Sequence, residues 1–372
     1  MYSVAPRPLC PFVVLDCDLR MAILTPERHI CVTRKGQESF IAQELTPLSE
    51  SCKCTQLAPG VVELTGVDIA FLSTHPVLFA SQILPQAFPL EGNSIKTIAT
   101  SIVNALIERL GDDGGEWCFH IYDPAAVDTG EEYSRPRLIH QEVTALLKLR
   151  RRSLLKGISR ECTKQSPLAQ VVVAGPQINF MSITTPEVQR ALRTNMSPHL
   201  AGYVDIPDDK NPPSRAFKKL LEAIEVFGLN PTRGQTCVDL GACPGGWTHV
   251  MTDRGLKTTG IDRSPLDDRL MRNKNVTFVK GDAFTWTPKE PVDWLICDVI
   301  TSPDRTLQIL ETWLSKHLCN SFCVTVKFKG TPDFENLLKI RHLFDEKTEW
   351  YDGKQLTNNK NELTVVGKVR AS

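Results

Sequence analysis

A glycine-rich turn in the C-terminal half of the chain has the residue types of a ligand-binding loop. It reads Gly241-Ala242-Cys243-Pro244-Gly245-Gly246-Trp247 and stands between an apolar strand pattern at 237–240 and a helical pattern. Glycines leave out the Cβ atoms that would keep a ligand from the backbone. The turn lacks the Gly-Lys-Ser/Thr ending of a P-loop and the spacing of a dinucleotide fingerprint. The pattern therefore disfavours nucleoside triphosphates and dinucleotides as ligands.

Two aspartates follow the next two predicted strands. Asp262 ends the segment 257–262, where it can accept hydrogen bonds from the two hydroxyls of a ribose. Asp282 ends the segment 276–282, where an acid can meet an adenine amino group. Either aspartate alone is equally well explained as a helix cap or a loop acid. Because both follow successive strands, the sequence predicts a nucleoside without a pyrophosphate, and S-adenosylmethionine is the common ligand of this kind.

Two lysines and two further acids fall around the same predicted pocket. Asp298 and Lys327 lie at the ends of two predicted strands, Glu362 heads the last strand, and Lys219 lies on the amphipathic helix 213–227. A lone surface lysine is usually inert. Two lysines and two acids around one nucleoside pocket are harder to dismiss as inert.

The elements that position these residues alternate between strand and helix from residue 214 to the C-terminus. This alternation predicts a parallel sheet with helices on both faces, whose ligand lies at the carboxyl ends of the strands. The segment 199–213, rich in Pro and Asp, is the predicted linker before it. We predict an N-terminal extension at 1–29, a small α/β module at 30–90 and a second α/β unit at 91–198.

The clearest predicted helix of the N-terminal half is 94–110, with Ser94 as its N-cap and apolar residues at three- and four-residue spacing. Strands are predicted at 116–123 and within 169–183, and a helix with a basic end at 140–158. A solvated helix face is one interpretation of that basic end. The other is a surface for a phosphate backbone, formed by Arg135, Arg137, Lys148, Arg150, Arg151, Arg152 and Lys156.

Composition limits the remaining possibilities. Lys plus Arg and Asp plus Glu number 43 each, so any attraction to nucleic acid must come from local patches. The twelve cysteines are scattered through a long chain, which favours reduced thiols in a cytoplasmic protein. The Cys52-x-Cys54 pair has no matching ligands nearby, so we expect no metal. No apolar run approaches the roughly 20 residues that span a bilayer.

The motifs of the C-terminal half resemble the FtsJ-type ribose 2'-O-methyltransferases. The resemblance runs from Pro213 to Arg370, with "SRAFKKLLEA" similar to their first helix and "DLGACPGGWT" to their cofactor loop. It looks closest to the bacterial 23S ribosomal RNA 2'-O-ribose methyltransferase M family, which methylates a cytidine. It implies a Rossmann-like class I methyltransferase domain at 214–372, S-adenosylmethionine as cofactor, and a catalytic tetrad of Lys219, Asp298, Lys327 and Glu362. The cofactor residues that it implies are Gly241 to Trp247, Asp262, Asp282 and Asp298.

The N-terminal half resembles the same family in the order of its parts. Residues 30–90 look like a ferredoxin-like module and residues 91–198 like a THUMP domain, an RNA-binding unit. The family likeness implies that the substrate is large-subunit ribosomal RNA before its assembly. Nothing in the sequence demands more than a monomer.

For the chemistry, we expect Lys327 to act as the general base beside cationic Lys219, with Asp298 and Glu362 orienting the two lysines. Methylation at C5 of cytosine needs a cysteine nucleophile, usually after the fourth strand. It is disfavoured here, because Cys297 precedes Asp298. Methylation of an exocyclic amine is disfavoured because "DVITS" lacks the Pro-Pro-aromatic turn. A cap-type messenger RNA 2'-O-methyltransferase and a catalytically silent RNA-binding or assembly factor remain alternatives.

Overall fold

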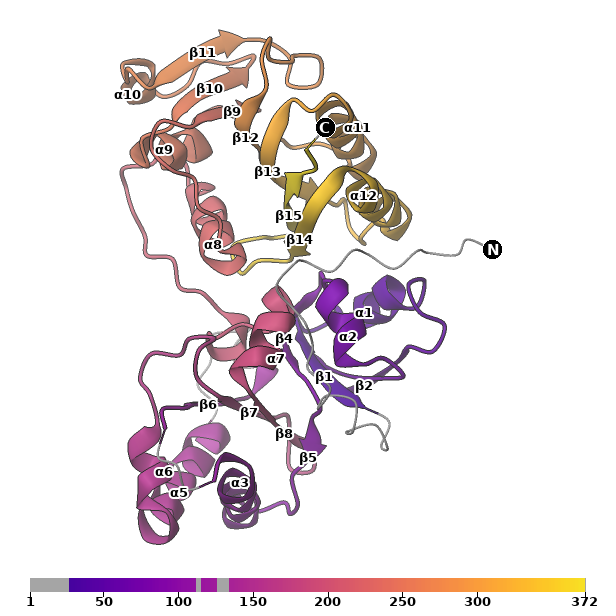
Figure 1. Ribbon diagram of the computed structural model, residues 1–372, viewed down its shortest axis with the longest axis vertical. Coiled ribbons are helices and arrows are strands. Elements are labelled where there is room, and N and C mark those ends of the chain that lie inside the picture. Colours follow the sequence, from indigo (N-terminus) through magenta and orange to yellow (C-terminus); the bar gives the residue numbers. More distant parts are fainter. Residues whose placement is uncertain (1–26, 112–114, 126–133, 372) are drawn as a thin grey trace. The chain divides into compact units, whose positions relative to one another are not determined.

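The computed structural model describes residues 27–111, 115–125 and 134–371 (Figure 1). The chain divides into two compact units, and the division between Tyr203 and Val204 lies inside the predicted linker 199–213. Most of the predicted extension 1–29 lies outside the described residues, and the first strand already begins at Arg28. No helix in the described part of the chain is long and apolar enough to cross a membrane.

The N-terminal unit opens with a ferredoxin-like sheet. The order of elements is βαββαβ, and the strands lie in the order β2-β3-β1-β4, each antiparallel to its neighbours. The sequence did not reveal β2 as a strand, because β2 lies at the edge of the sheet, leaves much of its surface in water and carries several polar residues. The elements are β1 Arg28–Thr33, α1 Glu38–Leu45, β2 Lys53–Ala58, β3 Val61–Thr65, α2 Ile69–Thr74 and β4 Ala80–Leu84.

A second sheet, in the order β5-β8-β7-β6, completes the N-terminal unit. Its strands are β5 Phe88–Pro89, β6 Cys118–Tyr122, β7 Leu168–Val173 and β8 Asn179–Thr184, and its helices are α3 Ile95–Leu110, α5 Ser134–Arg150, α6 Arg152–Gly157 and α7 Pro186–Ala191, followed by short 3-10 turns at Arg193–Asn195 and Leu200–Gly202. Because β5 pairs with β8, residues 88–89 belong with this sheet and not with the predicted module 30–90. The side chain of Gln82 in β4 bonds Gln170 in β7 at 2.7 Å, which joins the two sheets.

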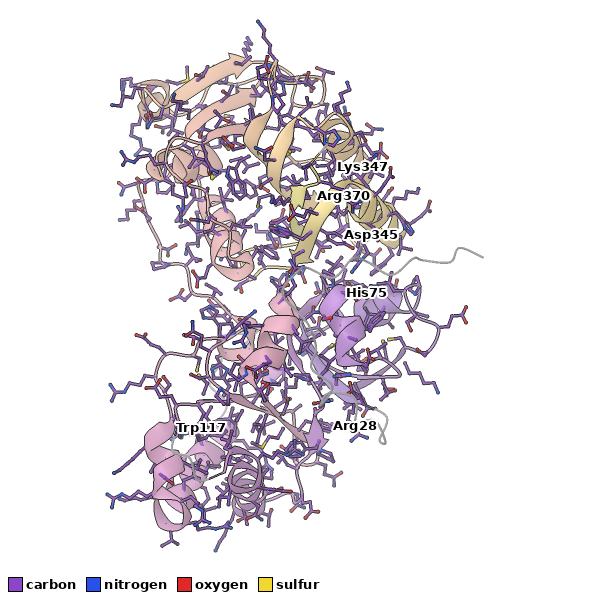
Figure 2. The ribbon with its side chains drawn as sticks, in the orientation of Figure 1. Arg28, His75, Trp117, Asp345, Lys347 and Arg370 are labelled. Atoms are coloured by element: carbon purple, nitrogen blue, oxygen red, sulfur yellow. The ribbon has the colours of Figure 1, made fainter. Side chains whose placement is uncertain are left out.

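One predicted helix of this sheet is confirmed, and another is corrected. α3 is confirmed, with Ser94 and Thr97 forming a reciprocal capping box at its start. The predicted helix 140–158 is instead two helices, because Arg151 between them has a non-helical backbone with φ −151° and ψ 76°. Trp117 then fixes α6 against β6 by donating its indole N–H to the carbonyl of Leu154 at 2.9 Å (Figure 2).

The C-terminal unit is a seven-stranded sheet in the order β11-β10-β9-β12-β13-β15-β14. The first five strands are parallel, as expected, but β15 runs antiparallel to both of its neighbours. The short connection 355–361 explains this, because a parallel return needs a long crossover. The strands are β9 Thr236–Leu240, β10 Lys257–Asp262, β11 Val276–Lys280, β12 Val292–Cys297, β13 Cys319–Lys327, β14 Thr348–Lys354 and β15 Glu362–Val369.

Helices cover both faces of this sheet, as predicted. Side chains alternate between faces along β13. Phe322 packs against Phe344 of α12 with the ring centroids 5.0 Å apart, while its neighbour Cys323 packs in the core cluster with Leu220 of α8. At the far end of the sheet, Arg370 donates to the carbonyl of Thr348 (Figure 2). The helices are α8 Phe217–Phe227, α9 Gly246–Asp253, α10 Asp268–Met271, α11 Pro303–Ser315 and α12 Phe334–Lys347.

Candidate active site

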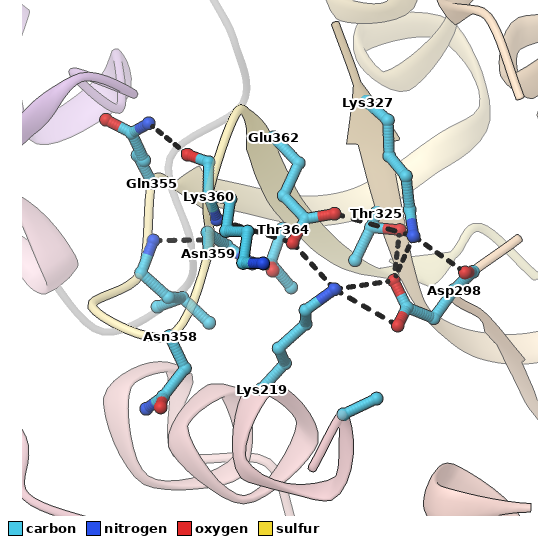
Figure 3. A network of polar contacts seen from close by, with 12 residues as sticks. Lys219, Asp298, Thr325, Lys327, Gln355, Asn358, Asn359, Lys360, Glu362 and Thr364 are labelled. Carbon is cyan, nitrogen blue, oxygen red and sulfur yellow. Dashed lines mark hydrogen bonds and ion pairs between the residues drawn. The ribbon is translucent and has the colours of Figure 1, made fainter. Parts of the chain in front are cut away.

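The two lysines and two acids of the predicted tetrad meet at one point of the C-terminal unit (Figure 3). Lys219 Nζ lies 3.1 Å from both carboxylate oxygens of Asp298 and 2.6 Å from Glu362 Oε1. Lys327 Nζ lies 2.9 Å from Asp298 Oδ1 and 3.5 Å from Glu362 Oε2. The cluster thus pairs two ammonium groups with two carboxylates, all of them at most 17% exposed.

Each member of this cluster is placed by a different element. Lys219 comes from α8, Asp298 follows β12, and Lys327 and Glu362 face each other in the antiparallel register of β13 and β15. Thr325 supports Asp298 with a hydroxyl bond of 2.9 Å to Oδ1. Glu362 reaches the two lysines because β15 lies beside β13, so the antiparallel strand completes the cluster.

The neighbouring lysine of α8 has another partner. Lys218 Nζ lies 2.7 Å from Asp208, away from the cluster, which selects Lys219 as the member of the tetrad. Burial alone would lower the pKa of Lys219, but Asp298 and Glu362 outweigh it and raise the pKa above its usual value. Lys219 is therefore held as a cation.

The glycine-rich turn connects the carboxyl end of β9 to α9. Its glycines do more than clear space for a ligand, because the chain itself occupies the positions that Cβ atoms would take. A Cβ on Gly245, which has φ +113°, would lie 2.2 Å from Leu270, and one on Gly246 would lie 2.4 Å from the hydroxyl of Ser214. Trp247 donates its indole N–H to the carbonyl of Ala216 at 2.9 Å. The turn is thereby tied to the start of α8, the helix of Lys219.

The two aspartates predicted to hold a nucleoside lie after adjacent strands, but both already accept hydrogen bonds from the chain. Asp262 accepts the backbone N–H groups of Cys243 at 3.0 Å and Ser264 at 2.9 Å. Asp282 accepts the N–H of Phe284 at 2.9 Å and lies 2.5 Å from Arg263, and these two contacts lower its pKa. Each carboxylate oxygen has a second lone pair. Their contacts with a ligand therefore stay predictions that the geometry permits.

A buried acid beside the turn was not predicted. Asp239 of β9 is 2% exposed and accepts the hydroxyl of Thr248 at 2.6 Å. Burial raises its pKa to about 7, and the charges of Asp298 and Asp262 add to the increase. The signal in the sequence was an acid inside an otherwise apolar strand, Cys237-Val-Asp-Leu240.

A cavity of about 1000 Å³ opens on the tetrad from the side of α8 and the 355–361 connection. Its lining includes Glu362, Ile300 and Phe328 and six cationic side chains: Arg215, Lys218, Lys219, Lys327, Lys329 and Lys360. None of the turn residues 241–247 lines it. The cavity is thus separate from the predicted cofactor loop and suits an anionic second ligand.

The predicted basic surface lies on α5 and α6 of the N-terminal unit. Arg137, Lys148, Arg150, Arg151, Arg152 and Lys156 are exposed there, together with Leu149 at 83% exposure. Arg135 differs, because it is half-buried and donates to the carbonyl of Asn93 at 2.6 Å. Its predicted role toward RNA thus competes with a structural one.

Comparison with known proteins gives the family of the C-terminal unit. Residues 212–353 match the FtsJ-like methyltransferase family. This segment is an FtsJ-like methyltransferase domain. The match confirms the resemblance seen in the motifs and contains Lys219, Asp298 and Lys327, whereas Glu362 lies beyond it and joins the site through the sheet register.

The proteins that match part of the chain include ones named ribosomal RNA large subunit methyltransferase M. The protein from Azoarcus sp. is 30% identical over 227 residues, which are 58% of this chain and 62% of that protein. The protein from Pseudomonas putida strain GB-1 is 36% identical over 167 residues, 41% of this chain and 46% of that protein. The chain thus matches about half to three fifths of the length of these relatives.

The buried Asp239 predicts a pH-dependent stability of the methyltransferase unit. Its pKa is raised when folded, so the folded state binds a proton that the unfolded state has released, and the free energy of unfolding falls as pH rises from about 4 to 7. Asp239→Asn should remove this fall, so that the variant gains on the order of 4 kcal/mol relative to the wild type by pH 8. Denaturant unfolding followed by tryptophan emission measures it, because Trp247, Trp286, Trp294, Trp313 and Trp350 lie in this unit.

Asp253→Asn, which alters an exposed acid of the same unit, is the matched control and should follow the wild type at every pH. If the free energy of unfolding depends on pH in the same way for the wild type and Asp239→Asn, the carboxyl group of Asp239 does not titrate in this range.

Proposed function

We propose that this protein transfers a methyl group from S-adenosylmethionine to a ribose 2'-hydroxyl of RNA, and that its substrate is a cytidine of large-subunit ribosomal RNA before assembly. The observation that carries the proposal is the Lys-Asp-Lys-Glu cluster, whose Lys219, Lys327 and Glu362 line a cationic cavity beside an FtsJ-like segment. The names of the relatives support the choice of ribosomal RNA.

The residues at the carboxyl ends of the strands fit S-adenosylmethionine. The turn 241–247 follows β9 at this edge of the sheet. Asp262 and Asp282 keep lone pairs that can accept hydrogen bonds from the ribose hydroxyls and the adenine amino group. Asp298 lies between this edge and the cavity. The bound cofactor would supply a sulfonium methyl group to the hydroxyl oxygen.

Within the tetrad, the two lysines have unequal surroundings. Lys219 lies nearer to Glu362, at 2.6 Å against 3.5 Å for Lys327, and contacts both oxygens of Asp298. Lys327 lies 2.9 Å from Asp298 Oδ1, whereas Lys219 contacts three carboxylate oxygens of the two acids at 3.1 Å or less. Lys327 also donates to the backbone carbonyl of Asp298 at 2.9 Å, a bond that a neutral amine retains. In our proposal Lys327 accepts the proton of the ribose hydroxyl while Lys219 stays charged.

Replacement of Lys327 tests the base. Lys327→Ala should lower kcat by about 100-fold or more, the usual contribution of general base catalysis, with little change in S-adenosylmethionine affinity. Lys327→Arg should be equally impaired, because a guanidinium keeps its charge and cannot accept a proton. The assay is transfer of labelled methyl to protein-free large-subunit ribosomal RNA, with digestion to nucleosides to identify 2'-O-methylcytidine.

Lys316→Ala, at an exposed lysine that does not line the cavity, is the control and should be fully active. Retention of most of kcat by either Lys327 variant would refute the assignment of the base. Label in a nucleoside other than 2'-O-methylcytidine would refute the cytidine assignment alone.

We also propose that the N-terminal unit is the RNA-binding part of a monomeric, cytoplasmic enzyme, with residues 91–198 acting as a THUMP domain. The exposed cations of α5 and α6 support the first point. The ten cysteines in the described part of the chain are all free thiols, which supports the reducing compartment.

Removal of charge from α5 and α6 tests this surface. The combined change of Lys148, Arg150, Arg152 and Lys156 to Gln should weaken RNA binding and reduce the slope of log affinity against log salt by about 0.7 for each phosphate that the variant no longer neutralises. Filter binding between about 50 and 200 mM salt measures both quantities. At saturating RNA, kcat should be unchanged, because the tetrad is intact. An unaltered slope would identify the basic segment as a merely solvated face.

A further inference from the structure

A second charged residue of α8 makes long-range contacts near the tetrad. Glu222 is 1% exposed and lies three residues after Lys219, on the same side of the helix. Its carboxylate accepts the backbone N–H groups of Thr357 at 2.6 Å and Asn358 at 2.8 Å, and the side-chain amide of Asn358 at 2.7 Å. A buried carboxylate needs such donors, and all three come from the connection 355–361 between β14 and β15.

The connection is also fixed by bonds of its own (Figure 3). The side-chain oxygen of Asn359 accepts the N–H of Leu356 at 2.9 Å and the hydroxyl of Thr364 at 3.0 Å, and Gln355 donates to the carbonyl of Lys360 at 2.9 Å. These bonds make the connection a compact turn. They do not attach the turn to α8, whereas the bonds of Glu222 do.

The position of the 355–361 connection determines two parts of the site. It leads directly into Glu362, and its residues 357–361 form one wall of the cavity. Lys218 and Lys219 of α8 and Arg215, which precedes the helix, also line the cavity. Glu222 therefore links α8 to the 355–361 connection by charge-assisted hydrogen bonds.

We propose that Glu222 is a positioning residue of the methyl transfer: it fixes the 355–361 connection against α8, so that Glu362 meets Lys219 and the cavity keeps the width that takes the RNA ribose. The inference rests on the proposed function. It gives α8 two contacts with neighbouring segments: the ion pair of Lys219 with Glu362 at the start of β15, and the hydrogen bonds that the connection donates to Glu222.

Glu222→Gln tests this role with a side chain of equal size. The amide retains one acceptor but directs an NH₂ group at donors, so the connection should loosen. We expect faster hydrogen exchange at the amides of Thr357 and Asn358, a higher KM for RNA, and a loss of kcat/KM on the order of 10- to 100-fold. The affinity for S-adenosylmethionine should stay within about twofold, because the turn 241–247 is untouched.

The control is Glu225→Gln, one turn further along the same helix at an exposed position, which should match the wild type in every assay. Asn358→Ala keeps both backbone donors and should show the same changes in weaker form. The double variant Glu222→Gln/Asn358→Ala should lose less than the product of the two single losses, because both changes remove one shared bond.

Wild-type exchange at Thr357 and Asn358 in Glu222→Gln, with kcat/KM within about twofold, would overturn the proposal. So would a fall in kcat that equals the loss of folded protein, with KM unchanged. If Glu222→Gln does not fold, Asn358→Ala decides alone: wild-type exchange and kinetics there would overturn the proposal. Absence of methyl transfer by the wild type would instead refute the proposed function.

Discussion

The methyltransferase unit is organised by four charged groups that are mostly shielded from water. A buried ammonium or carboxylate is costly unless it is paired, and removal of one partner leaves the others uncompensated. Since Lys219, Asp298, Lys327 and Glu362 come from one helix and three strands, their mutual contacts restrict where those elements can lie. The antiparallel register that opposes Lys327 to Glu362 is part of this constraint, because a slip of β15 by one residue would turn Glu362 to the other face of the sheet.

The same helix that carries Lys219 also connects the two halves of the site. Trp247 of the glycine-rich turn bonds the first turn of α8, and the missing Cβ of Gly246 lets Ser214 approach. On the other side, Glu222 bonds the connection that precedes Glu362. Methyl transfer requires two reactants at a fixed separation, and small displacements are costly. A single rigid helix in contact with both the turn and the cavity wall is a direct way to maintain that separation.

The sequence was sufficient for those parts of the site that depend on local patterns. Asp262, Asp298 and Lys327 follow apolar runs with strand periodicity, so their shared edge could be inferred from strand alternation alone. The contacts of Glu222 could not be inferred, because its three donors lie about 135 residues away and nothing in "KKLLEAIEV" distinguishes it from a solvated acid. The position of β15 depends on how three strands pair, which no local pattern specifies. The break at Arg151 was missed because the residues on both sides favour helix.

Electrostatics distinguishes the two sides of the site more sharply than shape does. Beside the glycine-rich turn, Asp239, Asp262 and Asp298 lie near enough to one another that the last two raise the pKa of the first. The cavity on the other side has six lysine and arginine side chains in its lining and one carboxylate, Glu362, which pairs with Lys219. A sulfonium cofactor is cationic and an RNA strand is anionic, so each proposed ligand would meet the opposite charge. Asp298 belongs to both sides, because it faces the strand ends of the acidic region and also binds the two ammonium groups. The proton leaving the ribose hydroxyl would therefore be transferred at the boundary between a negative and a positive region, where neither ligand has to enter the field that repels it.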